Sequence, residues 1–260
     1  MTPEERKEKK RKIRNKMDEI LKREDLVSGI YNYCDRWCER CTFTSKCMNF
    51  LMDQDMNNEC NDISNKEFWE ELSLQFEICA DMIKENFPDF DFDNSDEPVK
   101  MKKEKKSEAE IKAREYGLNV HKWFEENKEF VNQKAESMAS VSQEKVLSMI
   151  DAVEVINWYR FFIPGKVFRA TRKENEDYSD MDDELKQTIE EANSYDSLGS
   201  AKIALIAIER SLQAFSFLYT HMPEKEDDVL NFLSDLSVIK RKLSKAVPGA
   251  VDFKRPGFDD

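Results

Sequence analysis

The sequence predicts an all-α fold, a bundle of about six to seven helices with charged linkers and a turn-rich C-terminal tail. Charged residues make up 37% of the 260 residues and hydrophobic residues 40%, while glycine (6) and proline (7) are scarce. Few helix breakers and many Glu, Lys and Leu favour long helices over a sandwich or barrel. With no convincing strand alternation, we expect one helical domain over residues 1–260.

Capping signals and apolar periodicity predict the helices of the N-terminal part. Thr2, Pro3 and Glu5 begin a charged helix within residues 1–24, which we expect to fray at its start. A second helix is expected over residues 26–41. Ser64 and Glu67 resemble a capping box before a third helix, which the proline-containing segment from residue 88 ends.

The remaining helices are separated by two charged linkers, residues 86–106 and 173–195. Ser107 and Glu110 form a further capping box, before a helix that reaches about residue 136. Three more helices are expected, over residues 140–172, 198–219 and 224–245, and the first two are the most apolar. Pro164 and Gly165 are expected to kink or end the helix that contains them.

Four of the six cysteines lie within "YNYCDRWCERCTFTSKC", residues 31–47. On the predicted helix, Cys34, Cys38 and Cys41 are four and three residues apart and share one face. Residues 42–45 would end that helix and let the chain bring Cys47 back to the same point. The spacing therefore predicts a metal site with four thiolate ligands.

Two metal centres fit four thiolates. A tetrahedral zinc ion would act as a structural clamp for a protein-interaction surface, and we favour it because the sequence has no other recognisable redox motif. An iron–sulfur cluster in a redox or sensor protein is the alternative. Ordinary buried cysteines are also compatible with the pattern. Cys79 is expected in the core, and Cys60 is expected to be a free loop thiol.

A second candidate site is built around Glu154, which helical periodicity places in the middle of an apolar face. A buried carboxylate needs a partner, and Lys202 or Arg210 on the next apolar helix would supply one. With Glu209, these residues are candidate catalytic groups of an enzyme. A structural ion pair explains the same pattern, and we favour a role without catalysis.

Charge and hydropathy indicate in which environment the protein is found and which classes of partner it has. The net charge of −13 argues against a general nucleic-acid binder. No apolar run has the length of a membrane span, and the N-terminus lacks the apolar core of a secretory signal. We therefore expect a cytoplasmic protein with reduced thiols and a protein partner. The basic run Arg6–Arg14 is interpreted as a solvated helix that acidic segments of the same chain neutralise.

Overall fold

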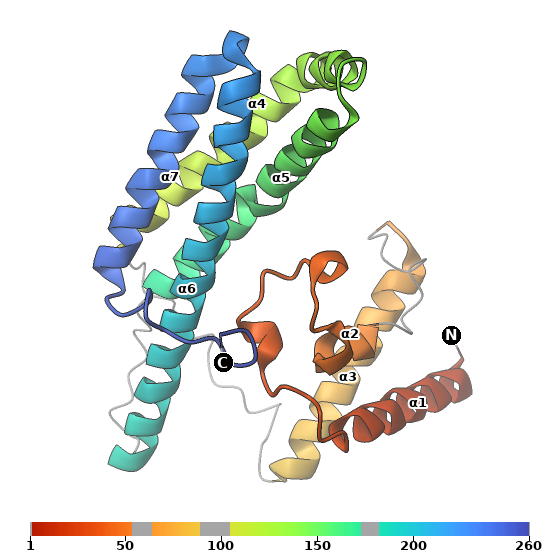
Figure 1. Ribbon diagram of the computed structural model, residues 1–260. Coiled ribbons are helices and arrows are strands. Elements are labelled where there is room, and N and C mark those ends of the chain that lie inside the picture. The colour runs from red at the N-terminus through yellow and green to blue at the C-terminus, as the bar shows by residue number, and fades with distance from the viewer. Residues whose placement is uncertain (1, 54–63, 89–104, 173–181, 260) are drawn as a thin grey trace. The chain divides into compact units, whose positions relative to one another are not determined.

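The structure is a computed structural model that describes residues 2–53, 64–88, 105–172 and 182–259. Within these ranges it contains seven α-helices and no strand, which confirms the all-α fold class (Figure 1). Backbone contacts divide the chain into two compact units. The first comprises Met1–Tyr31 and Arg36–Lys102, and the second comprises Asn32–Asp35 and Lys103–Asp260. Single-domain folding stays a prediction, because this division does not measure whether each unit folds independently.

The first unit contains α1 (Pro3–Leu21), the short α2 (Met48–Asp53) and α3 (Lys66–Asn86). The expected start of α1 is confirmed, since Thr2 and Glu5 form a reciprocal capping box. The start of α3 lies one residue later than expected. Its N-cap is Asn65, which makes no side-chain capping bond.

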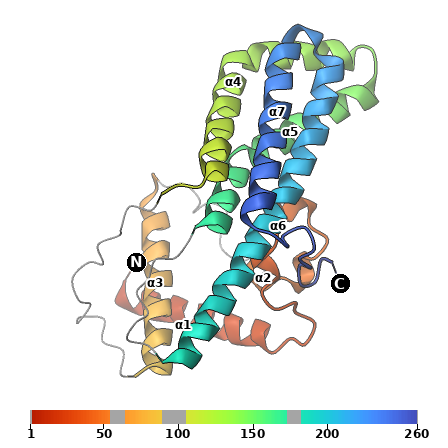
Figure 2. The same ribbon diagram turned by 90° about the vertical axis from the view of Figure 1, so that its left-hand side faces the viewer.

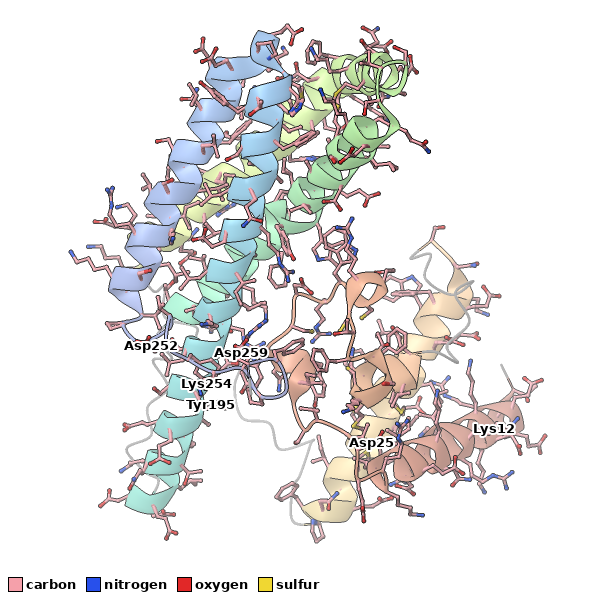
Figure 3. All side chains as sticks on the ribbon, in the orientation of Figure 1. Lys12, Asp25, Tyr195, Asp252, Lys254 and Asp259 are labelled. Atoms are coloured by element: carbon pink, nitrogen blue, oxygen red, sulfur yellow. The ribbon has the colours of Figure 1, made fainter. Side chains whose placement is uncertain are left out.

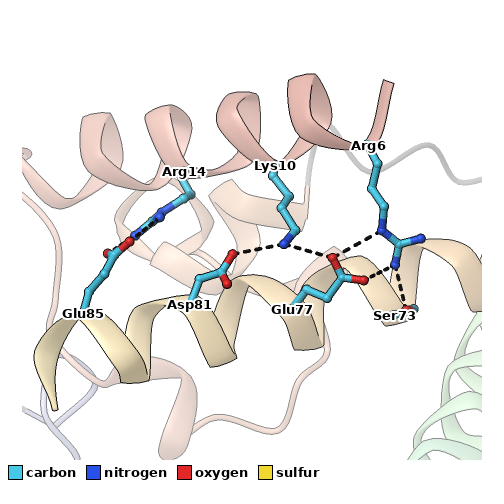
Figure 4. Close-up of polar contacts among 7 residues, drawn as sticks. All are labelled: Arg6, Lys10, Arg14, Ser73, Glu77, Asp81 and Glu85. Carbon is cyan, nitrogen blue, oxygen red and sulfur yellow. Dashed lines mark hydrogen bonds and ion pairs between the residues drawn. The ribbon is translucent and has the colours of Figure 1, made fainter. Parts of the chain in front are cut away.

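A ladder of ion pairs joins α1 to α3 (Figure 4). Arg6 contacts Glu77, Lys10 lies 2.9 Å from Glu77 and 3.0 Å from Asp81, and Arg14 contacts Glu85. The basic residues recur every four positions on α1 and the acidic residues every four on α3, so each helix turns one charged face to the other. These contacts neutralise part of the basic run Arg6–Arg14, as predicted from the acidic segments of the same chain.

The helix expected over residues 26–41 is wrong. This segment instead contains two short 3-10 turns, Ile30–Asn32 and Cys38–Arg40, and a third, Thr44–Lys46, follows. Gly29 and Arg36 have φ values of 68° and 60°. Such left-handed backbone cannot continue a right-handed α-helix, so the chain must change direction at both residues.

The second unit is a four-helix bundle of α4 (Glu108–Ala139), α5 (Gln143–Thr171), α6 (Asp183–His221) and α7 (Glu226–Ala246). Helix α5 packs against α4 and α6, and α7 packs against α6 and α4. The N-terminal part of α6 extends past the ends of the other three helices (Figures 1 and 2). Each helix therefore has two helical neighbours around a shared apolar core.

Two predicted boundaries of this unit are confirmed, and the predicted start of α6 is wrong. Ser107 caps α4 by accepting a hydrogen bond from the Glu110 N–H at 3.0 Å, and α7 begins and ends within two residues of its predicted limits. Helix α5 runs through Pro164 to Thr171, so it does not end at Pro164, and a kink at this residue stays a prediction. Helix α6 begins at Asp183, so the second half of the predicted linker 173–195 is helical. Most of the linker 86–106 lies outside the described residues.

Apolar residues at helical spacing face the core of the bundle. On α5 the buried set steps by three or four residues, and α7 follows the same rule. Tyr116, Tyr159 and Phe215 are the largest of the fully buried side chains. The buried residues of α5 are Met149, Ala152, Ile156, Tyr159, Ile163, Val167 and Ala170.

The chain after α7 consists of turns, as predicted, and returns to α6. Phe253 packs against Tyr195 of α6 with ring centroids 4.9 Å apart, and Figure 3 shows Tyr195 beside the segment with Asp252 and Lys254. Among the described helices, none combines the length and hydropathy that a membrane span requires.

Candidate functional site

The cysteine-containing segment folds back on the residues before it. The Val27 N–H donates to the Lys46 carbonyl at 3.1 Å, and Arg23 Nη2 donates to the Ser45 carbonyl at 2.9 Å. These bonds join residues about twenty positions apart, so the chain between them forms a closed loop. The chain just before Cys47 thus returns to Arg23 and Val27, but the expected return of Cys47 to Cys34, Cys38 and Cys41 is not found, and no helix leads into this turn.

Two tight turns hold three of the cysteines. The Cys41 N–H donates to the Cys38 carbonyl at 3.1 Å, and the Cys47 N–H donates to the Thr44 carbonyl at 3.2 Å. Between these turns, the Phe43 N–H donates to Cys41 Sγ at 3.4 Å. This bond fixes the orientation of the Cys41 side chain, and cysteine binds metals through its sulfur.

All four cysteines of the segment are half-buried. Cys38, Cys41 and Cys47 belong to the first compact unit, and Cys34 belongs to the second. Across the described ranges, no three Cys, His, Asp or Glu side chains are placed so that they could hold a metal ion. The cysteines thus have suitable chemistry and are not gathered at metal-binding distance.

The short piece Asn32–Asp35, which contains Cys34, is anchored to the helical bundle by a polar triad. Tyr159 Oη donates to Asp35 Oδ2 at 2.6 Å, and Arg210 Nη1 donates to both Tyr159 Oη (2.6 Å) and Asp35 Oδ2 (2.5 Å). Tyr159 is fully buried. Burial, followed by its bond to Asp35, raises the pKa of the Tyr159 hydroxyl, which therefore stays protonated at neutral pH.

Tyr33, the residue before Cys34, packs on the helical bundle. Its ring lies against Gly199 of α6, where an added Cβ would come within 2.4 Å of the ring. It also packs on Tyr195 and Phe253, each with ring centroids 5.7 Å away. A glycine at 199 is thus required for this close approach. The two neighbours of Cys34 in the chain are both held by the bundle.

The predicted burial of Glu154 is wrong, because its side chain is exposed on the outer face of α5. The other three catalytic candidates also have other partners. Arg210 contacts Asp35 and Tyr159, Lys202 donates to the Val251 carbonyl, and Glu209 pairs with Lys240. None of these described contacts brings Lys202, Glu209 or Arg210 to Glu154. A catalytic role for the four residues stays a prediction.

Cys79 is also placed differently from the prediction, since it is exposed on α3. Cys60 lies outside the described residues. Asp35 and Tyr159 were not predicted as site residues, because the triad depends on a contact between residues more than a hundred positions apart. The one local signal was an aspartate directly after Cys34.

Comparison with protein-family models, curated proteins and solved structures finds no match to this chain.

Proposed function

We propose that residues 34–47 bind one zinc ion through Cys34, Cys38, Cys41 and Cys47, and that this site is a structural clamp for a protein-interaction surface. The observation that carries the proposal is the N–H of Phe43 directed at Cys41 Sγ, within a closed loop that holds three of the four thiols. A hydrogen bond to a ligand atom holds that ligand in one orientation, as the outer-shell donors of metal sites do.

The arrangement of the thiols implies that metal binding is coupled to a conformational change. The four side chains are not gathered at metal distance, so the turns at Cys38 and Thr44 must adjust when the ion binds. Structural zinc sites commonly order their ligand loops in this way, because the binding energy also serves as folding energy. The anchored Asn32–Asp35 piece would give the site one fixed ligand.

Zinc is preferred to an iron–sulfur cluster because the sequence has no other recognisable redox motif. Zinc has no redox chemistry and completes a four-thiolate tetrahedron. A cluster is the alternative centre and would also take four thiolates. The two centres differ in colour, since a cluster absorbs visible light.

The test is the metal content of the full chain purified anaerobically. Wild-type protein is expected to hold about one zinc per chain with no visible absorption band. Cys38→Ser removes one ligand and is expected to lose the metal, whereas Cys79→Ser, which changes an exposed thiol on α3, is the matched control and is expected to keep it.

Three results contradict the zinc proposal. Full metal occupancy in Cys38→Ser would remove Cys38 from the ligand set. Iron with acid-labile sulfide in the wild-type protein would replace zinc by a cluster. A wild-type chain that binds no metal, even after zinc is supplied under reducing conditions, would leave the cysteines as packing residues.

A further inference from the structure

The 3-10 turn Cys38–Arg40 begins with one cysteine and is followed directly by another. Two backbone bonds define it, from the Arg40 N–H to the Trp37 carbonyl and from the Cys41 N–H to the Cys38 carbonyl, both at 3.1 Å. In a 3-10 turn, side chains three residues apart lie on the same side. Cys38 and Cys41 therefore project from one side of the turn.

The backbone of this turn meets the distance requirement of a disulfide. A hydrogen bond from an N–H to the carbonyl three residues earlier brings the two Cα atoms within about 7 Å of each other. Disulfide-bonded cysteines have Cα atoms roughly 4.4–6.8 Å apart. Both residues are free thiols in the structure, which thus shows the reduced form of the pair. A bond between them can close by rotation of the side chains, without breaking the turn.

The pair is accessible to a small reagent. Cys38 and Cys41 are half-buried, and the two residues between them, Glu39 and Arg40, are exposed. Both cysteines belong to the first compact unit, so the two ends of the bond are parts of one unit. The turn therefore offers two neighbouring thiols to a low-molecular-weight disulfide in solution.

The other two described cysteines of the first unit differ from this pair. Thr44–Lys46 is also a 3-10 turn followed by a cysteine, Cys47, but its first residue is a threonine. Cys79 is exposed on α3, and the residues three and four positions away on that helix are not cysteines. Among the described cysteines of this unit, one turn of backbone separates two thiols only at Cys38 and Cys41.

We propose that Cys38 and Cys41 form a reversible disulfide by exchange with a small disulfide such as oxidised glutathione, and that this bond releases the zinc ion. The release of zinc rests on the proposed function, whereas the disulfide itself does not. Zinc binds cysteine as the thiolate. A disulfide removes two of the four thiolates and leaves Cys34 and Cys47, which do not complete a zinc tetrahedron.

The exchange takes place in two steps. The thiolate of one cysteine attacks a sulfur of oxidised glutathione, forms a mixed disulfide and expels one glutathione thiolate. The thiolate of the other cysteine attacks the protein sulfur of this mixed disulfide and expels the second glutathione. The protein sulfurs lose two electrons, the glutathione disulfide gains them, and the protons of the two cysteine thiols end on two glutathione thiols. The turn makes the second step intramolecular, which favours ring closure.

The disulfide is tested on the full chain, reduced, freed of metal by a chelator, incubated with oxidised glutathione and quenched with an alkylating agent. Trypsin cuts after three basic residues around the pair, Arg36, Arg40 and Lys46. Cys38 and Cys41 then fall into separate peptides, residues 37–40 and 41–46. We expect mass spectrometry to find these two peptides joined by a disulfide, while the exposed Cys79 carries glutathione.

Two variants separate the disulfide from the zinc site. Cys47→Ser removes a proposed zinc ligand and keeps both cysteines of the turn, so it should bind no zinc and still form the disulfide. Cys38→Ser should do neither, and its Cys41 should carry glutathione. Circular dichroism verifies that each variant keeps its helical content.

The link between the disulfide and zinc is tested by the rate of oxidation. In the zinc-loaded wild-type chain the disulfide should form at least about tenfold more slowly than in the metal-free chain, because bound thiolates are not free to attack. One zinc should be released for each disulfide formed. Added zinc should leave the rate of Cys47→Ser unchanged.

The proposal is overturned if peptides 37–40 and 41–46 of the metal-free wild-type chain are not joined to each other, or if Cys41 is joined to Cys47 in preference. An equal rate with and without bound zinc would overturn the release of zinc by the disulfide. A reduced chain that binds no zinc and still forms the disulfide would contradict the proposed function and support the disulfide.

Discussion

Gly117 and Gly165 show how neighbouring helices use the same residue type differently. A Cβ at Gly117 would lie 2.5 Å from the Arg160 carbonyl oxygen, on the backbone of α5. Pro164 has no N–H, so the Arg160 carbonyl lacks the usual helical donor four residues later. The absence of a side chain at Gly117 lets α4 approach this carbonyl closely.

The two glycines are expected to respond oppositely to alanine. Gly165→Ala should raise the free energy of unfolding by about 0.5–1 kcal/mol, because alanine loses less backbone entropy in a helix. Gly117→Ala should lower it by about 1–3 kcal/mol, because its Cβ meets backbone that cannot move aside cheaply. Urea unfolding at low protein concentration measures both changes. A Gly117→Ala variant as stable as the wild type would contradict the close packing of α4 on α5.

At the level of single residues, the sequence indicated which faces are apolar better than it indicated which of them are buried. The apolar face that contains Glu154 exists, but α5 has a second apolar face through Ile156 and Tyr159, and that one is buried. A helical wheel shows that a face is apolar. When a helix has two apolar faces, the wheel does not show which of them is buried in the core. The choice depends on the packing of α4 and α6, which a single helix does not encode.

Elements with strong local signals were predicted well. The caps at Thr2 and Ser107 make side-chain hydrogen bonds to the backbone, and α7 follows its apolar period. The helix predicted over residues 26–41 does not form, because two residues with left-handed backbone interrupt it. Of these two, only Gly29 is a residue type that indicates such a backbone in the sequence. The start of α6 was missed because its acidic composition resembled a linker. Asp182 caps it by accepting from the Leu185 N–H at 2.8 Å.

The contact between α1 and α3 is expected to depend on pH. The bonds from Arg6 and Lys10 lower the pKa of Glu77, and the bond from Arg14 lowers the pKa of Glu85, both from an ordinary value of 4.5. A lowered pKa in the folded state means that these charges stabilise the contact above pH 4.5. That stabilisation is lost as the pH falls through the shifted values.

Carboxyl-carbon NMR titration checks this prediction directly. Glu85 should titrate below 4.5 in the wild type and return toward 4.5 in Arg14→Gln. Lys12→Gln is the control, since Lys12 pairs with Glu8 of its own helix, and it should leave the Glu85 midpoint unchanged. An ordinary Glu85 midpoint in the wild-type protein would show that the ladder is absent in solution.

The whole molecule combines a helical bundle with a smaller unit that contains α1, α2 and α3. The all-α class followed from composition, because few breakers and many helix-forming residues act along the entire chain. The division into two units did not follow, because it depends on which distant segments meet. Asn32–Asp35 is the clearest case, since Asp35 accepts a hydrogen bond from Tyr159 and the Tyr33 ring packs on Tyr195, both more than a hundred positions later in the chain.

The proposed zinc site is tested most directly by X-ray absorption at the zinc edge of the metal-loaded chain. Four thiolates predict a first shell of sulfur alone, about four neighbours at about 2.3 Å. A shell dominated by nitrogen or oxygen at about 2.0–2.1 Å would contradict the ligand set Cys34, Cys38, Cys41 and Cys47.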